Sequence, residues 1–332
     1  MKRKCALFIK ALIIALIGAL PITAQHYSYP FLNIPSTAQT VATGGVSLTF
    51  IDGNAGLAFE NPALYGEETA GRLFLSYYHA MPGVNSANTL YGLPINDRGS
   101  WAAGIRAINY GKIEGYDINN NATGAFSATD IAVEGLFSYD LTSKLRGGIA
   151  LKLIYSNIER YNAFAIATDV GLSYYNGEKG SSIGFAITNA GVTIKGFDKE
   201  RPLTAWDMRL GYSQSFRHIP FRLHLTAYGL NPQIFKTAIE KELSVRQKII
   251  RHLTLGIEYH YYRHFWVGIG YNVRAAQDLK IMGGNAFSGL SMGVGFNSDI
   301  IRCAIAVSRY HPQALGIMAT FSTTFGNDQY IF

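Results

Sequence analysis

The strictest constraint on the fold is a period of two in the last part of the chain. Apolar residues alternate with small or polar ones over Ile301–Ser308, and the alternation resumes over Leu315–Phe325. A period of two places successive side chains on opposite faces of a β-strand. This hairpin fits the wall of a membrane β-barrel, with lipid outside and a polar lumen inside. It fits equally a soluble β-sandwich, which hides its apolar face in a core.

The overall composition favours the membrane barrel. Charged residues make up 15% of the 332 residues and hydrophobic residues 48%. That charge content is low for a soluble surface. No apolar run reaches the roughly 20 residues of a membrane-spanning helix. The 21 tyrosines suit the interfacial girdles of outer-membrane barrels, and the 35 glycines suit strands that pack closely.

The first 24 residues have the pattern of a secretory signal peptide. A basic start at residues 2–4 precedes an apolar run over Ala11–Leu20, and Ala24 provides a small residue for cleavage. The mature chain is expected to begin at Gln25. The signal carries four of the cations behind the formal net charge of +7, so this charge argues little for a nucleic-acid partner. Cys303 is then the one mature cysteine, which excludes an intramolecular disulfide.

Residues 25–71 lack sustained alternation and are rich in turn signals, among them Pro30, Pro35 and the Gly44-Gly45 pair. The segment is too long for a leader to the first strand. We expect it to form a hatch, folded into the lumen as a plug, or a periplasmic extension. Its end carries the Asn61-Pro62-Ala63 element, the hatch motif.

Residues 72–332 are expected to form the barrel, in about fourteen strands counted as alternating runs. The predicted strands are Arg72–Met81, Ala87–Pro94, Gly99–Tyr110, Phe126–Tyr139, Lys144–Tyr155, Asn162–Tyr175, Ser181–Ala190, Thr204–Phe216, Phe221–Gly229, His252–Tyr261, Phe265–Arg274, Phe287–Asn297, Ile300–Tyr310 and Ala314–Phe325. Every second connection is short, and most of the others are longer, such as Gly111–Ala125. Bacterial barrels show this asymmetry, with short periplasmic turns and longer outer loops. The predicted location is therefore the outer membrane, with its lipid as the first partner.

Charged residues within the predicted strands share one face. A Lys or Arg on the lipid face at mid-membrane costs roughly 2–4 kcal/mol, so this face is assigned to the lumen. The predicted lumen charges are Lys152, Asp169, Asp207, Arg209, Arg222, Glu258, Arg274 and Arg302. Both signs occur, and internal ion pairs are expected.

The sequence contains no arrangement that indicates catalysis, a cofactor or a metal site. His260 and His264 are four residues apart, but a strand end and a tight turn separate them, unlike ligands on one helix face. The acidic pairs Glu114/Asp117 and Asp130/Glu134 are expected to be structural. A lumenal enzyme such as a barrel lipase would need a Ser–His–acid arrangement, and the sequence shows no recognisable one. We therefore expect a protein that is not an enzyme.

The connection Leu230–Arg251 predicts a short amphipathic helix, because Ile234, Ala238, Ile239 and Leu243 recur at helical spacing. The helix could cap the barrel. It could also dock a protein partner or anionic lipopolysaccharide through basic side chains. The candidate docking residues are Lys236, Lys241, Arg246, Lys248 and Arg251.

Four elements together resemble the PorQ family of the type IX secretion system. They are Tyr29–Pro35, Glu60–Leu64, Ile108–Gly111 and Tyr155–Tyr161. The Asn-Pro-Ala element alone is similar to the wider FadL-like outer-membrane family. The resemblance implies a fourteen-stranded barrel with an N-terminal hatch in a Bacteroidetes outer membrane. It implies a role in a surface attachment complex with PorU, PorV and a PorZ-like protein, in which PorU processes cargo and joins it to lipopolysaccharide.

Two functions follow as expectations. The first is a barrel without enzymatic activity that anchors this attachment complex. The alternative is a FadL-like transporter of hydrophobic small molecules. Transport predicts a ligand-sized apolar pocket and an opening in the wall, and the mixed charges of the lumen argue mildly against it.

Overall fold

The computed structural model describes residues 27–49, 53–197, 201–231, 243–262, 264–281, 287–309 and 314–324. The expected signal peptide, residues 1–24, lies outside these ranges, as do the candidate docking residues Lys236 and Lys241. Within the described residues no helix is long and apolar enough to cross a membrane.

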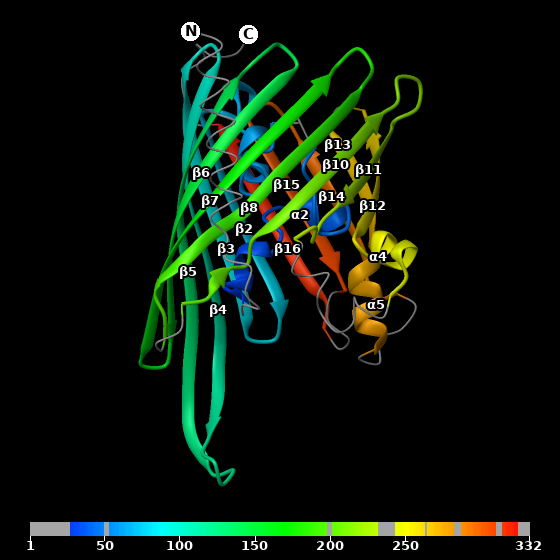
Figure 1. The fold of residues 1–332 in the computed structure, drawn as a ribbon. Helices are drawn as coiled ribbons and strands as arrows, with labels where there is room; N and C mark the ends of the chain where they lie inside the picture. The colour runs from blue at the N-terminus through cyan, green and yellow to red at the C-terminus, as the bar shows by residue number, and fades with distance from the viewer. Residues whose placement is uncertain are drawn as a thin grey trace.

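Fourteen antiparallel strands form a closed wall within the described residues (Figure 1). They are β2 (Arg72–Met81), β3 (Val84–Asn96), β4 (Gly99–Tyr116), β5 (Ala122–Asp140), β6 (Leu145–Ile158), β7 (Tyr161–Asn176), β8 (Ser181–Lys195), β10 (Asp207–Ser215), β11 (Phe221–Ala227), β12 (Leu253–Tyr261), β13 (Phe265–Asn272), β14 (Leu290–Asn297), β15 (Ile301–Ser308) and β16 (Gly316–Thr324). The ring closes where β16 pairs with β2, with Phe321 opposite Leu75. The predicted fourteen-stranded antiparallel barrel is confirmed.

Alternating burial shows which face of the wall meets lipid. On β12, Leu255 and Ile257 are each 50% exposed on the outer side. Thr254 and Glu258 lie on the opposite face and are fully buried. The whole strand repeats this alternation. The outer face therefore carries the apolar side chains that a bilayer requires, and the polar groups point into the lumen.

Several strand boundaries differ from the sequence prediction, and three of the differences change how the strands are connected. The predicted outer loop Gly111–Ala125 is mostly a continuation of β4 and β5, which pair as far as Tyr116 and Ala122. The predicted strand Thr204–Phe216 is broken, because the two-residue strand β9 (Leu203–Thr204) ends before β10 begins. The predicted strand Phe265–Arg274 ends at Asn272, where helix α5 (Val273–Ile281) starts.

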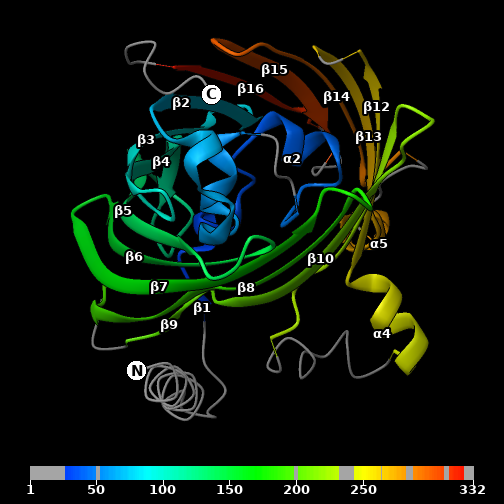
Figure 2. The ribbon, with the colours of Figure 1, turned by 90° about the horizontal axis from the view of Figure 1, so that it is seen from above.

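The hatch lies inside the ring of strands, as the view along the barrel shows (Figure 2). It consists of single turns and one short helix: η1 (Pro30–Asn33), α2 (Ala38–Ala42), η2 (Ala55–Phe59), η3 (Pro62–Leu64) and η4 (Glu67–Thr69). Before it, the short strand β1 (Tyr27–Ser28) pairs in parallel with β9. Hatch residues supply one side of each of the three main apolar clusters and the wall supplies the other. The core of this barrel is therefore the hatch–wall contact.

The two ends of the barrel differ. Short turns join the strands at one end, whereas the β4–β5 hairpin projects far beyond the wall at the other (Figure 1). Helix α5 and helix α4 (Val245–Arg251) lie at the end with the hairpin. Outer-membrane barrels place their longer connections outside the cell. We therefore call this the outer end.

Candidate functional site: the hatch–wall junction

The hatch motif sits at the centre of the junction. Asn61 is fully buried, and its Oδ1 accepts a hydrogen bond of 3.0 Å from the Ala63 N–H, which caps the turn that Pro62 begins. The Asn61 Nδ2 donates to the Leu172 carbonyl oxygen on β7 at 3.2 Å. One side chain thus orders the hatch turn and ties it to the wall. The Asn-Pro-Ala sequence follows from this geometry, because Pro at the first helical position needs no N–H donor.

Glycines in the wall make room for this turn. A Cβ on Gly171 would overlap the Asn61 carboxamide, and a Cβ on Gly148 would overlap the backbone of Pro62 and Ala63. Both glycines occupy lumen-facing positions on neighbouring strands, where β6 pairs with β7. The hatch backbone therefore lies directly on the wall, with no side chain between them.

Arg209 joins the hatch to the wall by charge. It is 4% exposed, and its guanidinium meets Glu60 Oε2 at 3.0 Å and Asp207 Oδ2 at 2.9 Å. Its Nη2 also donates to Asn33 Oδ1 at 2.7 Å. The other oxygen of Glu60 accepts from the backbone N–H and the hydroxyl of Ser36. A buried charge is tolerated when it is paired and hydrogen-bonded in this way.

A second charge cluster lies in the wall beside the first. Lys152 is fully buried, with Nζ 2.6 Å from Asp169 Oδ2 and 3.7 Å from Glu134 Oε2. Lys152 also donates to Asn189 Oδ1 at 2.7 Å. The Asn189 Nδ2 in turn donates to Asn33 Oδ1 at 3.0 Å, so Asn33 of the hatch bridges both clusters. Ion pairs among the predicted lumen charges are thus present in both clusters.

Asn189 reaches this position through a break in the β7–β8 ladder. The register shifts between Thr168 and Val170, and Asn189 has a left-handed backbone with φ 57°. Asn tolerates this conformation better than most residues. The bulge turns the Asn189 N–H toward Asp169, to which it donates a 2.6 Å hydrogen bond. The alternation of side chains along a strand does not reveal such a bulge, so the sequence did not predict Asn189 as a lumen residue.

Arg106 is a further lumen residue that sequence analysis missed. Its Nη1 donates to the Leu32 carbonyl at 3.0 Å and its Nη2 to the Ile34 carbonyl at 2.6 Å. The guanidinium also lies over the Phe59 ring, 5.4 Å from its centroid. The alternating pattern could have identified it, because Arg106 occupies an inward-facing position of the run that forms β4.

A third cluster holds helix α2 of the hatch. Glu258 Oε1 accepts from the Gln39 Nε2 at 3.0 Å. Its Oε2 faces His260 Nε2 at 3.1 Å, His224 Nε2 at 3.3 Å and Arg222 Nη1 at 3.6 Å. Two histidines and a carboxylate suggest a metal site at first sight. However, the part of the chain that the structure describes contains no group of His, Cys, Asp and Glu arranged to hold an ion.

Arg274 is the one predicted lumen charge that does not lie on a strand. It lies on α5 at the outer end, where its Nε is 3.8 Å from Asp278 Oδ2. The predicted strand Phe265–Arg274 was wrong at its end, because Asn272 ends the strand: its side chain accepts from the Ala275 N–H and so starts the helix. Arg302 is on β15 and half-buried, and it lines a crevice against the hatch.

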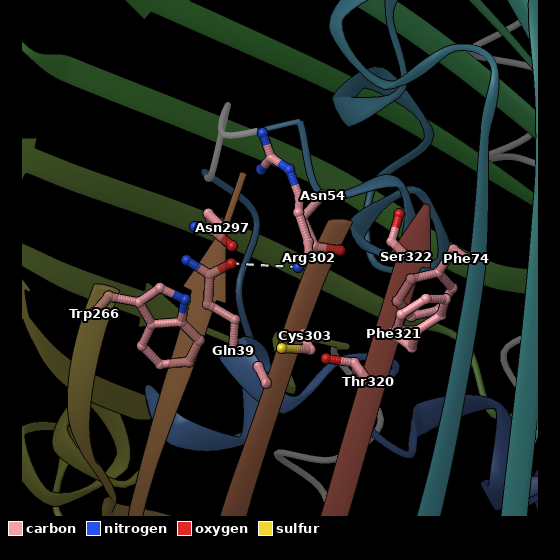
Figure 3. A pocket seen from close by; sticks show the side chains of 11 residues that line it. Gln39, Asn54, Phe74, Trp266, Asn297, Arg302, Cys303, Thr320, Phe321 and Ser322 are labelled. Atoms are coloured by element: carbon pink, nitrogen blue, oxygen red, sulfur yellow. Dashed lines mark hydrogen bonds between the residues drawn. The ribbon is translucent and has the colours of Figure 1, made fainter. Parts of the chain in front are cut away.

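This crevice lies between hatch residues Gln39 and Asn54 and the wall strands β13 to β16 and β2 (Figure 3). Asn54 Nδ2 donates to Gln39 Oε1 at 3.3 Å across its edge. Phe74 and Trp266 provide aromatic lining. The free volume is about 20 Å3, which is room for roughly one water molecule. This crevice is therefore too small to be the ligand-sized apolar pocket expected of a transporter.

No family model matches the sequence, and no curated protein matches it. Solved structures do match over nearly their whole length. The Pseudomonas putida toluene transporter TodX is 12% identical, with a TM-score of 0.57, covering 91% of this chain and 100% of TodX. The monoaromatic hydrocarbon channel CymD is 10% identical, with a TM-score of 0.52, covering 90% of this chain and 100% of CymD.

The chain shares the fold of these outer-membrane barrels, a closed antiparallel barrel of fourteen strands. Its place in the bacterial outer membrane, predicted from the alternating strands, is confirmed with the fold. At these identities the comparisons concern the fold alone. The resemblance to the PorQ family stays a prediction.

Proposed function

We propose that this FadL-like barrel transfers hydrophobic small molecules across the outer membrane. The observation that carries the proposal is the match of the fold, over about nine-tenths of the chain, to two proteins that are monoaromatic hydrocarbon channels. Among the described residues, no cluster of metal-ligating side chains points instead to metal-assisted catalysis.

Transport requires the hatch to move. An apolar cavity of about 150 Å3 is needed to hold a ligand as small as benzene, far more than the crevice offers. One wall of the crevice is formed by Gln39 and Asn54, which belong to the hatch. Displacing α2 would therefore enlarge a space that already has Phe74 and Trp266 on its wall side.

The test is uptake of radiolabelled toluene and of a long-chain fatty acid by cells with and without the gene. Uptake of at least one compound is expected to fall on deletion and to return when the gene is restored. Equal uptake of both compounds by deleted and complete cells would contradict transport. Abundance of an unrelated outer-membrane barrel controls for general damage to the envelope.

A second function is favoured by the fixed hatch inside the ring and by the projecting hairpin. The buried Arg209–Glu60 ion pair and the hydrogen bond that Gln39 donates to Glu258 fix the hatch, which suits a barrel that serves as an anchor. With the four sequence elements that resemble the PorQ family, this supports anchoring of attachment-complex proteins of the type IX system. The proposed partners are a PorZ-like surface protein, PorU and PorV.

The β4–β5 hairpin offers such partners an ordered surface. At its tip the Asp117 Oδ1 accepts from the N–H groups of Asn119 and Asn121, both at 2.8 Å. The bond from the Asn121 backbone holds the pKa of Asp117 below its usual range, so the tip is charged. Beside it Ile118 is fully exposed and Tyr116 is 55% exposed. Exposed apolar side chains beside a fixed, charged turn are a reasonable protein contact.

Purification in mild detergent, followed by mass spectrometry of whatever stays bound, separates the two functions. Anchoring predicts a stoichiometric surface protein with the parent chain and its loss when residues 112–125 are replaced by a short turn. A barrel that purifies with a hydrophobic ligand and without a surface protein would favour transport and contradict the anchoring role.

A further inference from the structure

Helix α4 lies outside the wall of the barrel (Figure 2) and at its outer end (Figure 1). It leads directly into β12, with His252 as the one residue between them. Ser244 caps its start, accepting from the Gln247 N–H. The helix is therefore an ordered feature of the outer surface.

The inner side of α4 is fixed to helix α5. Arg251 is 4% exposed and its guanidinium bonds Gln277 Oε1 at 3.1 Å and Asp278 Oδ1 at 2.5 Å. Arg251, which the sequence suggested for docking, is thus used to join the two helices. This contact leaves the opposite side of α4 turned away from the barrel.

That opposite side combines apolar and basic groups. Val245 is 75% exposed, Ile249 60% and Ile250 40%. Arg246 is exposed among them, and Lys248 lies at their edge, partly exposed. Three unburied aliphatic side chains on a seven-residue helix are unusual in contact with water alone, and the basic groups beside them are typical of helices at a lipid interface.

The height of α4 on the barrel fits that interface. Strand β12 has nine residues, which span about 23 Å along the membrane normal at a rise of ~3.3 Å and a tilt of ~40°. This is close to the roughly 25 Å apolar band of an outer-membrane barrel. Tyr261 and Tyr262, exposed at the other end of β12, fit the aromatic girdle there. Helix α4 then lies at the level of the outer-leaflet headgroups.

We propose that α4 binds lipid A, the phosphorylated glycolipid that anchors lipopolysaccharide in the outer leaflet. Val245, Ile249 and Ile250 enter the acyl region, continuing the lipid-facing surface of β12. Arg246 and Lys248 contact the phosphates. The opposite charges of these groups, and the direct continuity of α4 with a lipid-facing strand, favour a lipid over a protein partner.

The first test measures lipid A binding to the purified full chain in detergent by native mass spectrometry. The double variant Arg246→Ala/Lys248→Ala is expected to bind on the order of 30-fold more weakly, as the loss of two interfacial cations predicts. The matched control is Lys112→Ala/Arg160→Ala, which removes two exposed cations elsewhere at the outer end and is expected to bind as the parent does. Heat-modifiable migration in gels verifies that each barrel is folded.

The second test places a probe on the helix. In the variant Ile249→Trp, reconstituted in bilayers of lipid A and phosphatidylcholine, brominated acyl chains are expected to quench the added fluorescence. The same barrel with Ile118→Trp, at the hairpin tip, controls for contact with water. Equal lipid A binding by the double variant and the parent overturns the proposal, as does added fluorescence from Ile249→Trp that is not quenched. Equally tight binding of phosphatidylglycerol through the same two cations overturns the assignment to lipid A.

Discussion

At the scale of single residues, the junction follows one rule: each buried charge of the lumen meets an opposite charge or a hydrogen-bonding partner. Glu60 is the clearest case, because its two oxygens serve different parts of the fold. One accepts from Ser36 within the hatch and the other meets Arg209 of the wall. Such a residue orders the hatch and fixes its position at once.

Replacing Glu60 by Ala is expected to loosen the hatch. Arg209 would keep Asp207 and the hydrogen bond to Asn33 but lose its carboxylate partner on the hatch, and breaking a buried pair costs roughly 3–5 kcal/mol. Protease cleavage within residues 53–71, measured against urea concentration, should begin at lower urea than in the parent. The control is Glu67→Ala, an exposed carboxylate on the same hatch. Identical midpoints for both variants would show that the Glu60–Arg209 pair does not hold the hatch.

Lys152 supports a different prediction, because it lies between two carboxylates of the wall. In Lys152→Met, Asp169 and Glu134 stay buried without their cation, and the cost is again about 3–5 kcal/mol. The temperature at which the barrel unfolds in detergent should fall clearly. Adding Asp169→Asn and Glu134→Gln to the same chain should restore most of the loss, since the uncompensated charges are gone. No recovery would mean that Lys152 acts through packing.

At the scale of elements, alternation was enough to predict the strands and their lumen face. The pairs themselves could not be predicted, because Arg209 finds Glu60 only once the hatch is inside the ring. Asn189 was missed since a bulge breaks the period that defines a strand. Arg274 was misplaced because Asn272 caps a helix where the apolar pattern still continues. Turn residues showed that residues 25–71 are not part of the wall, whereas the choice between a plug and a periplasmic extension, and the contact with wall glycines, required the fold.

Because the hatch lies against lumen-facing glycines, a larger side chain at one of them should displace it. Valine at Gly171 would occupy the space of the Asn61 carboxamide, and the overlap should cost about 1–3 kcal/mol and shift the turn. Cleavage of the hatch by added protease should increase, while the barrel still shows heat-modifiable migration. Gly135→Val is the matched control, because a Cβ there meets nothing within 4 Å on the lipid side. Equal protection of both variants would contradict the close approach of hatch and wall.

At the scale of the whole molecule, the barrel and its hatch form a closed unit that shares a core. The three apolar clusters each combine hatch and wall residues, so the wall without the hatch has little interior of its own. Hatch side chains therefore occupy space that the wall of a channel-like fold would otherwise enclose. Both proposed functions depend on this unit. Transport requires the hatch to move and open the barrel, whereas anchoring requires the hatch to stay in place.

Removing the plug should therefore reveal a pore. In planar bilayers the parent is expected to pass almost no steady current, because the hatch fills the lumen. A chain that lacks residues 30–64 should conduct at least about tenfold more, since larger barrels leave an aqueous channel when their lumen is empty. Should that chain fail to assemble, the combination Glu60→Ala/Gly171→Val tests the same point with the hatch present but released, and it should give brief openings. If an assembled barrel without the hatch passes as little current as the parent, the wall side chains close the lumen by themselves.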